Sequence, residues 1–301
     1  MKYIKNFTLL VFFIAISTIN AFSQATAAQT APGKDFIITA KDFKNAVKSD
    51  QNIVIIDAGK PKDYPVNHLK NAMYILYDDL NIDNPEVPLG TIQTPEFIGE
   101  YFGKKGITAD DNIVIYDDGS QKYSSRMYVL FKYVGANNVK LLHKDIDEWG
   151  KERLPLTTQV PKEREPATFV VNTNNDFFVD LDYVMKNKDN PNVVLVDVRS
   201  PEEYTGVKKV VDGKFGHIPG SINIPYEEFE TASGAFKTKA QLQELADKYG
   251  LSNDKEIVFF CKTGVKGSVA YIAFDNILGH PNAKLYDGGC ADYCSKYELV
   301  K

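Results

Sequence analysis

The chain has 301 residues, of which 44% are hydrophobic, so it can bury one large core or two of ordinary size. Its formal net charge of −5 argues against a nucleic-acid partner. No group of His, Cys and Asp residues has metal-ligand spacing, so the sequence implies no metal and no other cofactor.

The first 25 residues have the pattern of an export signal. Lys2 and Lys5 precede an apolar run at residues 7–16, and small residues follow at 21–28. The apolar run is short for a membrane-spanning helix, and an uncleaved anchor is the alternative. We therefore expect a signal peptide at residues 1–25 and a periplasmic or secreted protein. Once the signal is removed, we expect no stable membrane association.

The rest of the chain is an internal duplication. Residues 192–204 repeat residues 52–64, and a second block at residues 238–285 repeats residues 94–141. In each copy, short apolar runs alternate with helical segments, which is typical of a parallel sheet covered on both faces. The sequence therefore predicts an α/β protein with two tandem domains, each a parallel sheet flanked by helices on both faces.

The domain boundaries follow from composition. Order is expected to begin near Phe36, after a small and polar stretch. Residues 151–168 are rich in Pro, Thr and charge, which is typical of an interdomain linker. We place the first domain at residues 36–155, the linker at 156–174 and the second domain at 175–301.

The most distinctive stretch follows the apolar run at residues 257–260. It reads Cys261-Lys262-Thr263-Gly264-Val265-Lys266 and leads into a segment of helical composition. A loop that enters a helix directs several backbone N–H groups, and the positive end of the helix dipole, into one concavity. The two lysines add positive charge, which favours both an ionised thiol and an anionic substrate. We therefore predict that Cys261 is a nucleophile.

This loop, between a buried strand and a helix, resembles the active-site loop of the rhodanese family of sulfurtransferases, and the duplication resembles tandem rhodaneses. The resemblance implies that Cys261 takes a sulfane sulfur from a donor, becomes a persulfide and passes the sulfur to a thiophilic acceptor. The donor would be bound by Lys262, Thr263, Gly264, Val265 and Lys266, together with Asp197 and Arg199. Phosphatases of this fold need an arginine six positions after the cysteine, where this chain has Gly267.

The choice of donor is less closely defined. A basic loop suits a dianion such as thiosulfate, whereas family members that use 3-mercaptopyruvate usually have small uncharged residues after the cysteine. We expect a thiosulfate sulfurtransferase, with 3-mercaptopyruvate as the alternative donor. A module that holds a persulfide or a partner protein without turnover is the alternative function. Glu203 and Tyr293 replace an arginine and a tryptophan that are common in the family, which weakens the transfer of its donor preferences to this chain.

The duplication predicts that the first domain is catalytically inactive. Asp117 occupies the position equivalent to Cys261 and cannot act as a sulfur nucleophile. Its negative charge also lies where an anion would bind. The first domain has Gly59 where the second has Arg199, which agrees with a loss of function.

Several residues have two interpretations. Asp197 and Arg199 end an apolar strand, where ligands gather in α/β sheets, but they could instead form a buried ion pair that fixes the loop. We expect His217 to fix a turn rather than to act as a base. Cys290 and Cys294 could be two buried thiols or a disulfide pair, and one of them could be a resolving thiol for Cys261.

Overall fold

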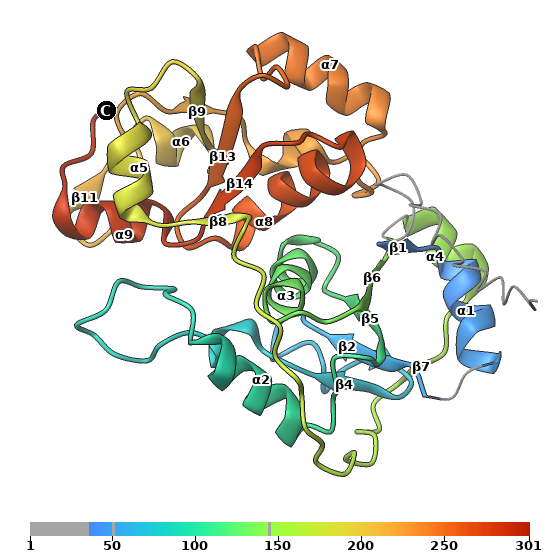
Figure 1. Ribbon diagram of the computed structural model, residues 1–301. Helices are drawn as coiled ribbons and strands as arrows, with labels where there is room; N and C mark the ends of the chain where they lie inside the picture. The colour runs from blue at the N-terminus through green and yellow to red at the C-terminus, as the bar shows by residue number, and fades with distance from the viewer. Residues whose placement is uncertain (1–35, 50–51, 144–145) are drawn as a thin grey trace, which may run out of the picture. The chain divides into compact units, whose positions relative to one another are not determined.

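The computed structural model describes residues 36–49, 52–143 and 146–301 (Figure 1). The predicted signal peptide at residues 1–25 lies outside the described residues. All of the described residues belong to one compact unit. No helix in the described ranges combines the length and the apolar character needed to cross a bilayer.

The first domain contains a parallel five-stranded sheet with the order β1-β6-β5-β2-β4. Its strands are β1 (Ile37–Ile38), β2 (Val54–Asp57), β4 (Ala72–Tyr74), β5 (Asn112–Tyr116) and β6 (Asn138–Leu142). The helical elements of this domain are α1 (Ala40–Ser49), η1 (Tyr77–Leu80), α2 (Pro95–Lys104), α3 (Lys122–Tyr133) and α4 (Ile146–Glu152). A small antiparallel pair joins β3 (His68–Leu69) to β7 (Leu156–Thr157).

The second domain repeats this topology, with the sheet order β12-β9-β13-β14-β8. Its strands are β8 (Phe178–Val179), β9 (Val193–Asp197), β12 (Ile222–Asn223), β13 (Glu256–Phe260) and β14 (Ala283–Tyr286). The other elements are α5 (Leu181–Asn187), α6 (Pro201–Tyr204), the pair β10 (Lys209–Val211) and β11 (Lys214–Phe215), η2 (Tyr226–Phe229), α7 (Lys239–Tyr249), α8 (Val265–Ile272), the π-helical turn η3 (Ala273–Leu278) and α9 (Gly289–Lys296). The predicted fold of two parallel α/β domains is confirmed.

Strand β13 shows why the apolar runs identify the centre of each sheet. It lies between β9 and β14, and its last four residues are fully buried. A central parallel strand is covered on both faces, so it needs an unbroken apolar run rather than an alternating pattern. The loop that follows this strand is therefore held at the middle of the sheet edge.

The predicted linker packs closely against the first domain. Its first two residues form β7, which pairs with β3. Further along, the linker follows α2, where a Cβ atom at Gly103 would lie 2.6 Å from the carbonyl oxygen of Ala167. Glycine at this position of α2 therefore allows the linker backbone to approach the helix.

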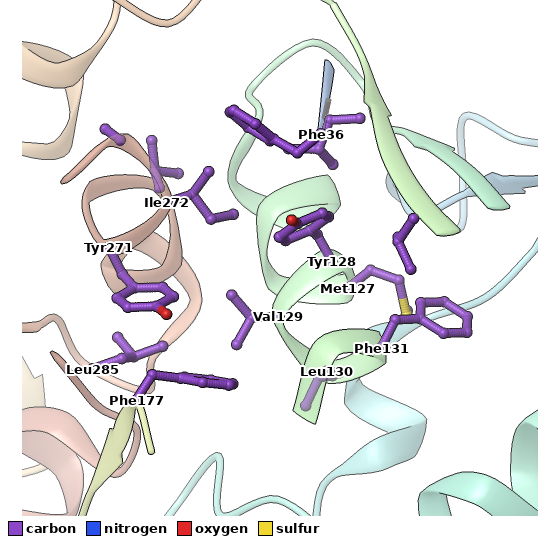
Figure 2. Packing of buried hydrophobic residues seen from close by; sticks show 14 of the residues in the cluster. Phe36, Met127, Tyr128, Val129, Leu130, Phe131, Phe177, Tyr271, Ile272 and Leu285 are labelled. Atoms are coloured by element: carbon purple, nitrogen blue, oxygen red, sulfur yellow. The ribbon is translucent and has the colours of Figure 1, made fainter. Parts of the chain in front are cut away.

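The two domains meet through equivalent helices, α3 and α8, as Figure 2 shows. Val129 of α3 and Tyr271 and Ile272 of α8 belong to one buried apolar cluster that contains residues of both domains. Burial of this shared surface favours a fixed arrangement of the two domains. The helix that follows the loop of Asp117 is thus packed against the helix that follows Cys261.

Candidate active site

Cys261 lies directly after β13, at the turn into α8. Gly264 caps this helix with φ of +74°, a left-handed conformation that favours glycine. The carbonyl oxygen of Cys261 accepts a hydrogen bond from the backbone N–H of Cys290 at 2.8 Å. A Cβ atom at Gly289 would lie only 2.4 Å from that oxygen. The start of α9 thus fixes the loop through this hydrogen bond. It can approach the loop closely because residue 289 is a glycine.

The backbone N–H groups of the loop are available to an anion. Within the described residues, no protein acceptor pairs with the N–H groups of residues 262–267. The first N–H groups of a helix lack intrahelical partners, and the helix dipole makes their surroundings favourable for negative charge. The unpaired N–H groups therefore lie where the sequence predicts a cradle for an ionised sulfur or an oxyanion, and that role stays a prediction.

The equivalent cradle in the first domain is already filled. One carboxylate oxygen of Asp117 accepts hydrogen bonds from the N–H groups of Gly119 and Gln121, at 2.8 and 3.1 Å. The other accepts from the N–H groups of Tyr123 and Ser124, both at 3.1 Å, and from the Ser124 hydroxyl at 3.2 Å. Asp117 thus places its own carboxylate where an anion would bind, which gives a second physical reason, besides the missing thiol, to expect no activity in this domain.

The two lysines of the loop differ in their surroundings. The Nζ atom of Lys266 lies 3.4 Å from Oε2 of Glu203, whereas the described residues offer Lys262 no carboxylate within salt-bridge distance. Burial opposes ionisation of Glu203, but Lys266 and the backbone N–H of Ser200 outweigh it and lower the pKa of this carboxyl. The charge of Lys266 is therefore partly balanced, and Lys262 is the freer cation of the pair.

Asp197 and Arg199 form a buried ion pair. Nε and Nη2 of Arg199 both donate to the Asp197 carboxylate, at 3.0 and 2.5 Å for the nearest oxygens, and Nη2 also donates to the carbonyl oxygen of Gly216. Burial opposes the charge of Arg199, but the hydrogen bonds to Asp197 raise its pKa. Both side chains are almost fully inaccessible to solvent. The geometry therefore shows the buried ion pair that was one of the two interpretations. Of the Arg199 nitrogen atoms, only Nη1 lacks a hydrogen-bond partner among the described residues.

His217 fixes a turn, as predicted. Its Nδ1 atom lies 2.9 Å from the carbonyl oxygen of Tyr204, and the two rings stack with centroids 3.8 Å apart. The first domain repeats the arrangement with His68 and Tyr64, at 2.7 Å and 3.9 Å. A feature that is also present in the domain without the thiol is explained by the fold rather than by sulfur chemistry.

The three cysteines are all buried free thiols, so the disulfide between Cys290 and Cys294 is not formed. Sγ of Cys290 lies 3.9 Å from Oδ2 of Asp197. Burial, together with the nearby charge of Asp197, raises the pKa of the Cys290 thiol well above its ordinary value. Burial also raises the pKa of Cys294. A raised thiol pKa lowers the thiolate fraction, so these two residues fit the interpretation as buried thiols better than that of a resolving nucleophile.

Two first-domain residues that the sequence did not single out lie against the loop. Gly90, with φ of +83°, packs so closely on Thr263 that a Cβ atom there would lie 2.5 Å from Cβ of that residue. Arg126 of α3 is fully buried and pairs with Asp287 beside Gly264. The duplication could have pointed to Arg126, because this arginine differs from Ala270 at the equivalent position of the second domain.

The molecule has two notable cavities. One, of about 390 Å³, lies in the first domain beside Asp117 and Trp149. The other, of about 870 Å³, lies between residues 86–92 of the first domain and residues 286–292 of the second. Cys261 is 2% exposed, and it lines neither of these two cavities. The described residues contain no cluster of His, Cys, Asp and Glu side chains suited to a metal ion.

Comparison with known proteins agrees with this geometry. The model of the rhodanese-like domain matches residues 39–152 and 180–296. A provisionally named thiosulfate sulfurtransferase of Haloferax volcanii is 31% identical over 208 residues, which are 67% of this chain and 72% of that protein. The sulfur carrier protein TtuD of Thermus thermophilus is 28% identical, with 81% of this chain and 85% of that protein covered.

Solved structures show the same fold. The Tum1 protein of Saccharomyces cerevisiae superposes with a TM-score of 0.75 at 21% identity, covering 86% of this chain and 95% of that one. The anaerobic ergothioneine biosynthesis enzyme of Chlorobium limicola superposes with a TM-score of 0.77 at 21% identity, covering 89% of this chain and 71% of that one. At these identities the likeness concerns the fold alone.

Proposed function

Because the chain belongs to the rhodanese-like domain family, we propose that it transfers a sulfane sulfur from thiosulfate to a thiophilic acceptor through a persulfide on Cys261. The observation that carries the proposal is the contrast between the two cradles. The cradle of the first domain holds its own carboxylate, whereas that of the second begins with a thiol and keeps the N–H groups of residues 262–267 unpaired.

The chemistry has two steps. The Cys261 thiolate attacks the outer sulfur of thiosulfate, the sulfur–sulfur bond of the donor breaks, and sulfite leaves with the bonding electron pair. The acceptor then attacks the terminal sulfur of the persulfide, and Cys261 leaves as a thiolate. Both steps keep negative charge on sulfur inside the loop, where the N–H groups, the helix dipole and Lys262 stabilise it.

Thiosulfate is the preferred donor because the loop is basic. Lys262 directly follows the nucleophile and has no carboxylate partner among the described residues, so it is free to attract a dianion. A donor with one carboxylate, such as 3-mercaptopyruvate, would gain less from this charge. A kinetic comparison tests the choice: a higher kcat/KM with 3-mercaptopyruvate than with thiosulfate would contradict it.

The similarity to a sulfur carrier favours a second candidate function. In that case Cys261 would receive sulfur and hand it to a partner protein, with little turnover on small acceptors. Cyanide-dependent formation of thiocyanate separates the two candidates. Rapid turnover supports the enzyme, whereas stable loading of Cys261 without turnover supports the carrier.

The decisive experiment is the mass of the protein after incubation with thiosulfate. We expect a gain of one sulfur atom at Cys261, its removal by cyanide, and no gain in Cys261→Ser. An unmodified Cys261 would refute the proposal. We also propose export through residues 1–25, which the N-terminal sequence of the protein isolated from its native host would test.

A further inference from the structure

Arg126 of the first domain holds an open pair of hydrogen-bond donors beside the loop of the second domain. Its side chain is fully buried, and Nη1 forms an ion pair with Oδ1 of Asp287. Its Nε and Nη2 atoms are buried and have no hydrogen-bond partner. A buried guanidinium normally has its donors satisfied, because an unpaired buried polar group is costly. Two open donors on one buried arginine therefore indicate that something else completes the site.

The geometry of the open donors defines what fits them. Nε–H and Nη2–H lie in the guanidinium plane along one edge and form a fork that matches two oxygens of a sulfonate, carboxylate or phosphate. In Arg199 this same fork is filled by Asp197. Tyr77 and Asp78 of η1 lie near enough for their pKa values to respond to the charge of Arg126, but neither accepts a hydrogen bond from the fork.

The guanidinium that carries the fork lies next to the predicted site of sulfur transfer, which it approaches through Nη1. A Cβ atom at Gly264 would lie 2.8 Å from Nη1 of Arg126 and 2.7 Å from Oδ1 of Asp287. Gly264 is the cap of α8 and lies three residues after Cys261. Asp287 also lines the cleft of about 870 Å³ between the two domains. Arg126 therefore lies beside the loop and pairs with a residue that lines the cleft.

The second domain itself offers the oxyanion few cations, since Lys262 is its one loop lysine without a carboxylate partner among the described residues. Its own Lys266 is paired with Glu203, and its own Arg199 is held by Asp197. We propose that Arg126 is a donor-binding residue, whose Nε and Nη2 bind the oxyanion end of the sulfur donor, the sulfonate of thiosulfate. This inference rests on the proposed function, and it makes the inactive domain a part of the donor site.

The test separates anion binding from turnover. In a Cys261→Ala background, which cannot be loaded, thiosulfate binding is measured by calorimetry with and without Arg126→Lys. The lysine keeps the positive charge but removes the fork. We expect the dissociation constant to rise at least tenfold. The matched control is Arg164→Lys, because Arg164 is an arginine of the linker that pairs with Asp111, and we expect it to leave binding unchanged.

Folding is controlled by a second variant. Arg126→Met combined with Asp287→Asn removes both charges of the buried pair, so neither is left unpaired. If Arg126→Lys does not fold, this double variant replaces it in the binding experiment, and the same tenfold loss is expected. In the enzyme with Cys261 intact, Arg126→Lys should raise KM for thiosulfate about tenfold and change kcat less than threefold.

Three outcomes overturn the inference. They are equal thiosulfate binding with and without Arg126→Lys, no measurable binding to Cys261→Ala, and a loss of kcat without a change of KM. The two binding outcomes do not depend on whether Cys261 is loaded in the unmodified protein, whereas the kinetic outcome requires turnover. Failure of Cys261 to gain sulfur would instead refute the proposed function, so the two results are distinct.

Discussion

The carboxylate of Asp117 fills the cradle of the first domain. Removing this carboxylate should make the thermal stability of the domain depend on a bound anion. In Asp117→Ala, four backbone N–H groups lose their acceptor, whereas the Ser124 hydroxyl keeps the carbonyl oxygen of Gln121 at 3.1 Å. Hydrogen bonds to a charged group contribute about 1.5–3 kcal/mol each. In the variant, water replaces some of these hydrogen bonds, and the free energy that burial of the carboxylate costs is recovered. We expect a net loss of about 2–4 kcal/mol. For a chain of this size the loss corresponds to a fall in Tm of about 5–10 °C.

The assay is thermal unfolding of Asp117→Ala with increasing sulfate, against chloride at the same ionic strength. Sulfate should occupy the vacated cradle, and at a hundred times its dissociation constant it would restore about 2.7 kcal/mol. The matched control is Asp118→Ala. Asp118 accepts one backbone N–H and pairs with the half-exposed Lys60, so its loss should cost less than about 1 kcal/mol. An unchanged Tm for Asp117→Ala, or equal rescue by sulfate in both variants, would refute the reasoning.

Three further predictions concern the second domain. Gly289→Ala places a methyl group 2.4 Å from a backbone oxygen at φ of +55°, so it should lower sulfur loading at least tenfold. The control Gly213→Ala has φ of +75° but open space around it, so it should cost only about 1–2 kcal/mol of stability. Similar effects of the two variants on sulfur loading would contradict this. Because burial raises the pKa of Cys290, iodoacetamide at pH 8 should alkylate Cys261 slowly in the folded protein and leave Cys290 unmodified, whereas both thiols should react in unfolded controls; peptide mapping that finds Cys290 labelled first in the folded protein would exclude this account. The lowered pKa of Glu203 means that its ionised form stabilises the fold above pH 4.5 and that this contribution is lost as the pH falls further. Glu203→Gln should therefore make the stability depend less on pH at acid pH. An unchanged dependence of stability on pH would show that the carboxylate contributes nothing.

Much of the fold could be predicted because each copy carries its own periodic signal. The apolar run before Cys261 predicts a central strand, and β13 is central in its sheet. The duplication predicts two sheets with one topology, which the two strand orders confirm. The position of Cys261 at a turn between strand and helix also follows from the local sequence, because strand, turn and helix propensities each act over a few residues.

The contacts between the domains could not be predicted in the same way. Arg126 and Asp287 are 161 positions apart, and no local pattern states which helix of one copy packs on which helix of the other. The pairing of α3 with α8 decides that Arg126 reaches the loop of Cys261. Similarly, nothing in the sequence around Gly90 indicates that it must pack on Thr263. The sequence therefore predicts the nucleophile but not the residues of the other domain that lie against its loop.

The two domains together suggest why the copy without the thiol is retained. Its cradle holds its own carboxylate, so its loop needs no ligand to be stable, while its helix α3 forms the apolar surface against α8. The copy that keeps the thiol has the opposite arrangement, because its N–H groups are left open for a transient ligand. An open cradle is less stable than a filled one, since its donors lack partners until the ligand arrives. The first domain therefore provides a fixed surface beside the second, and this surface places Arg126 next to the loop of Cys261.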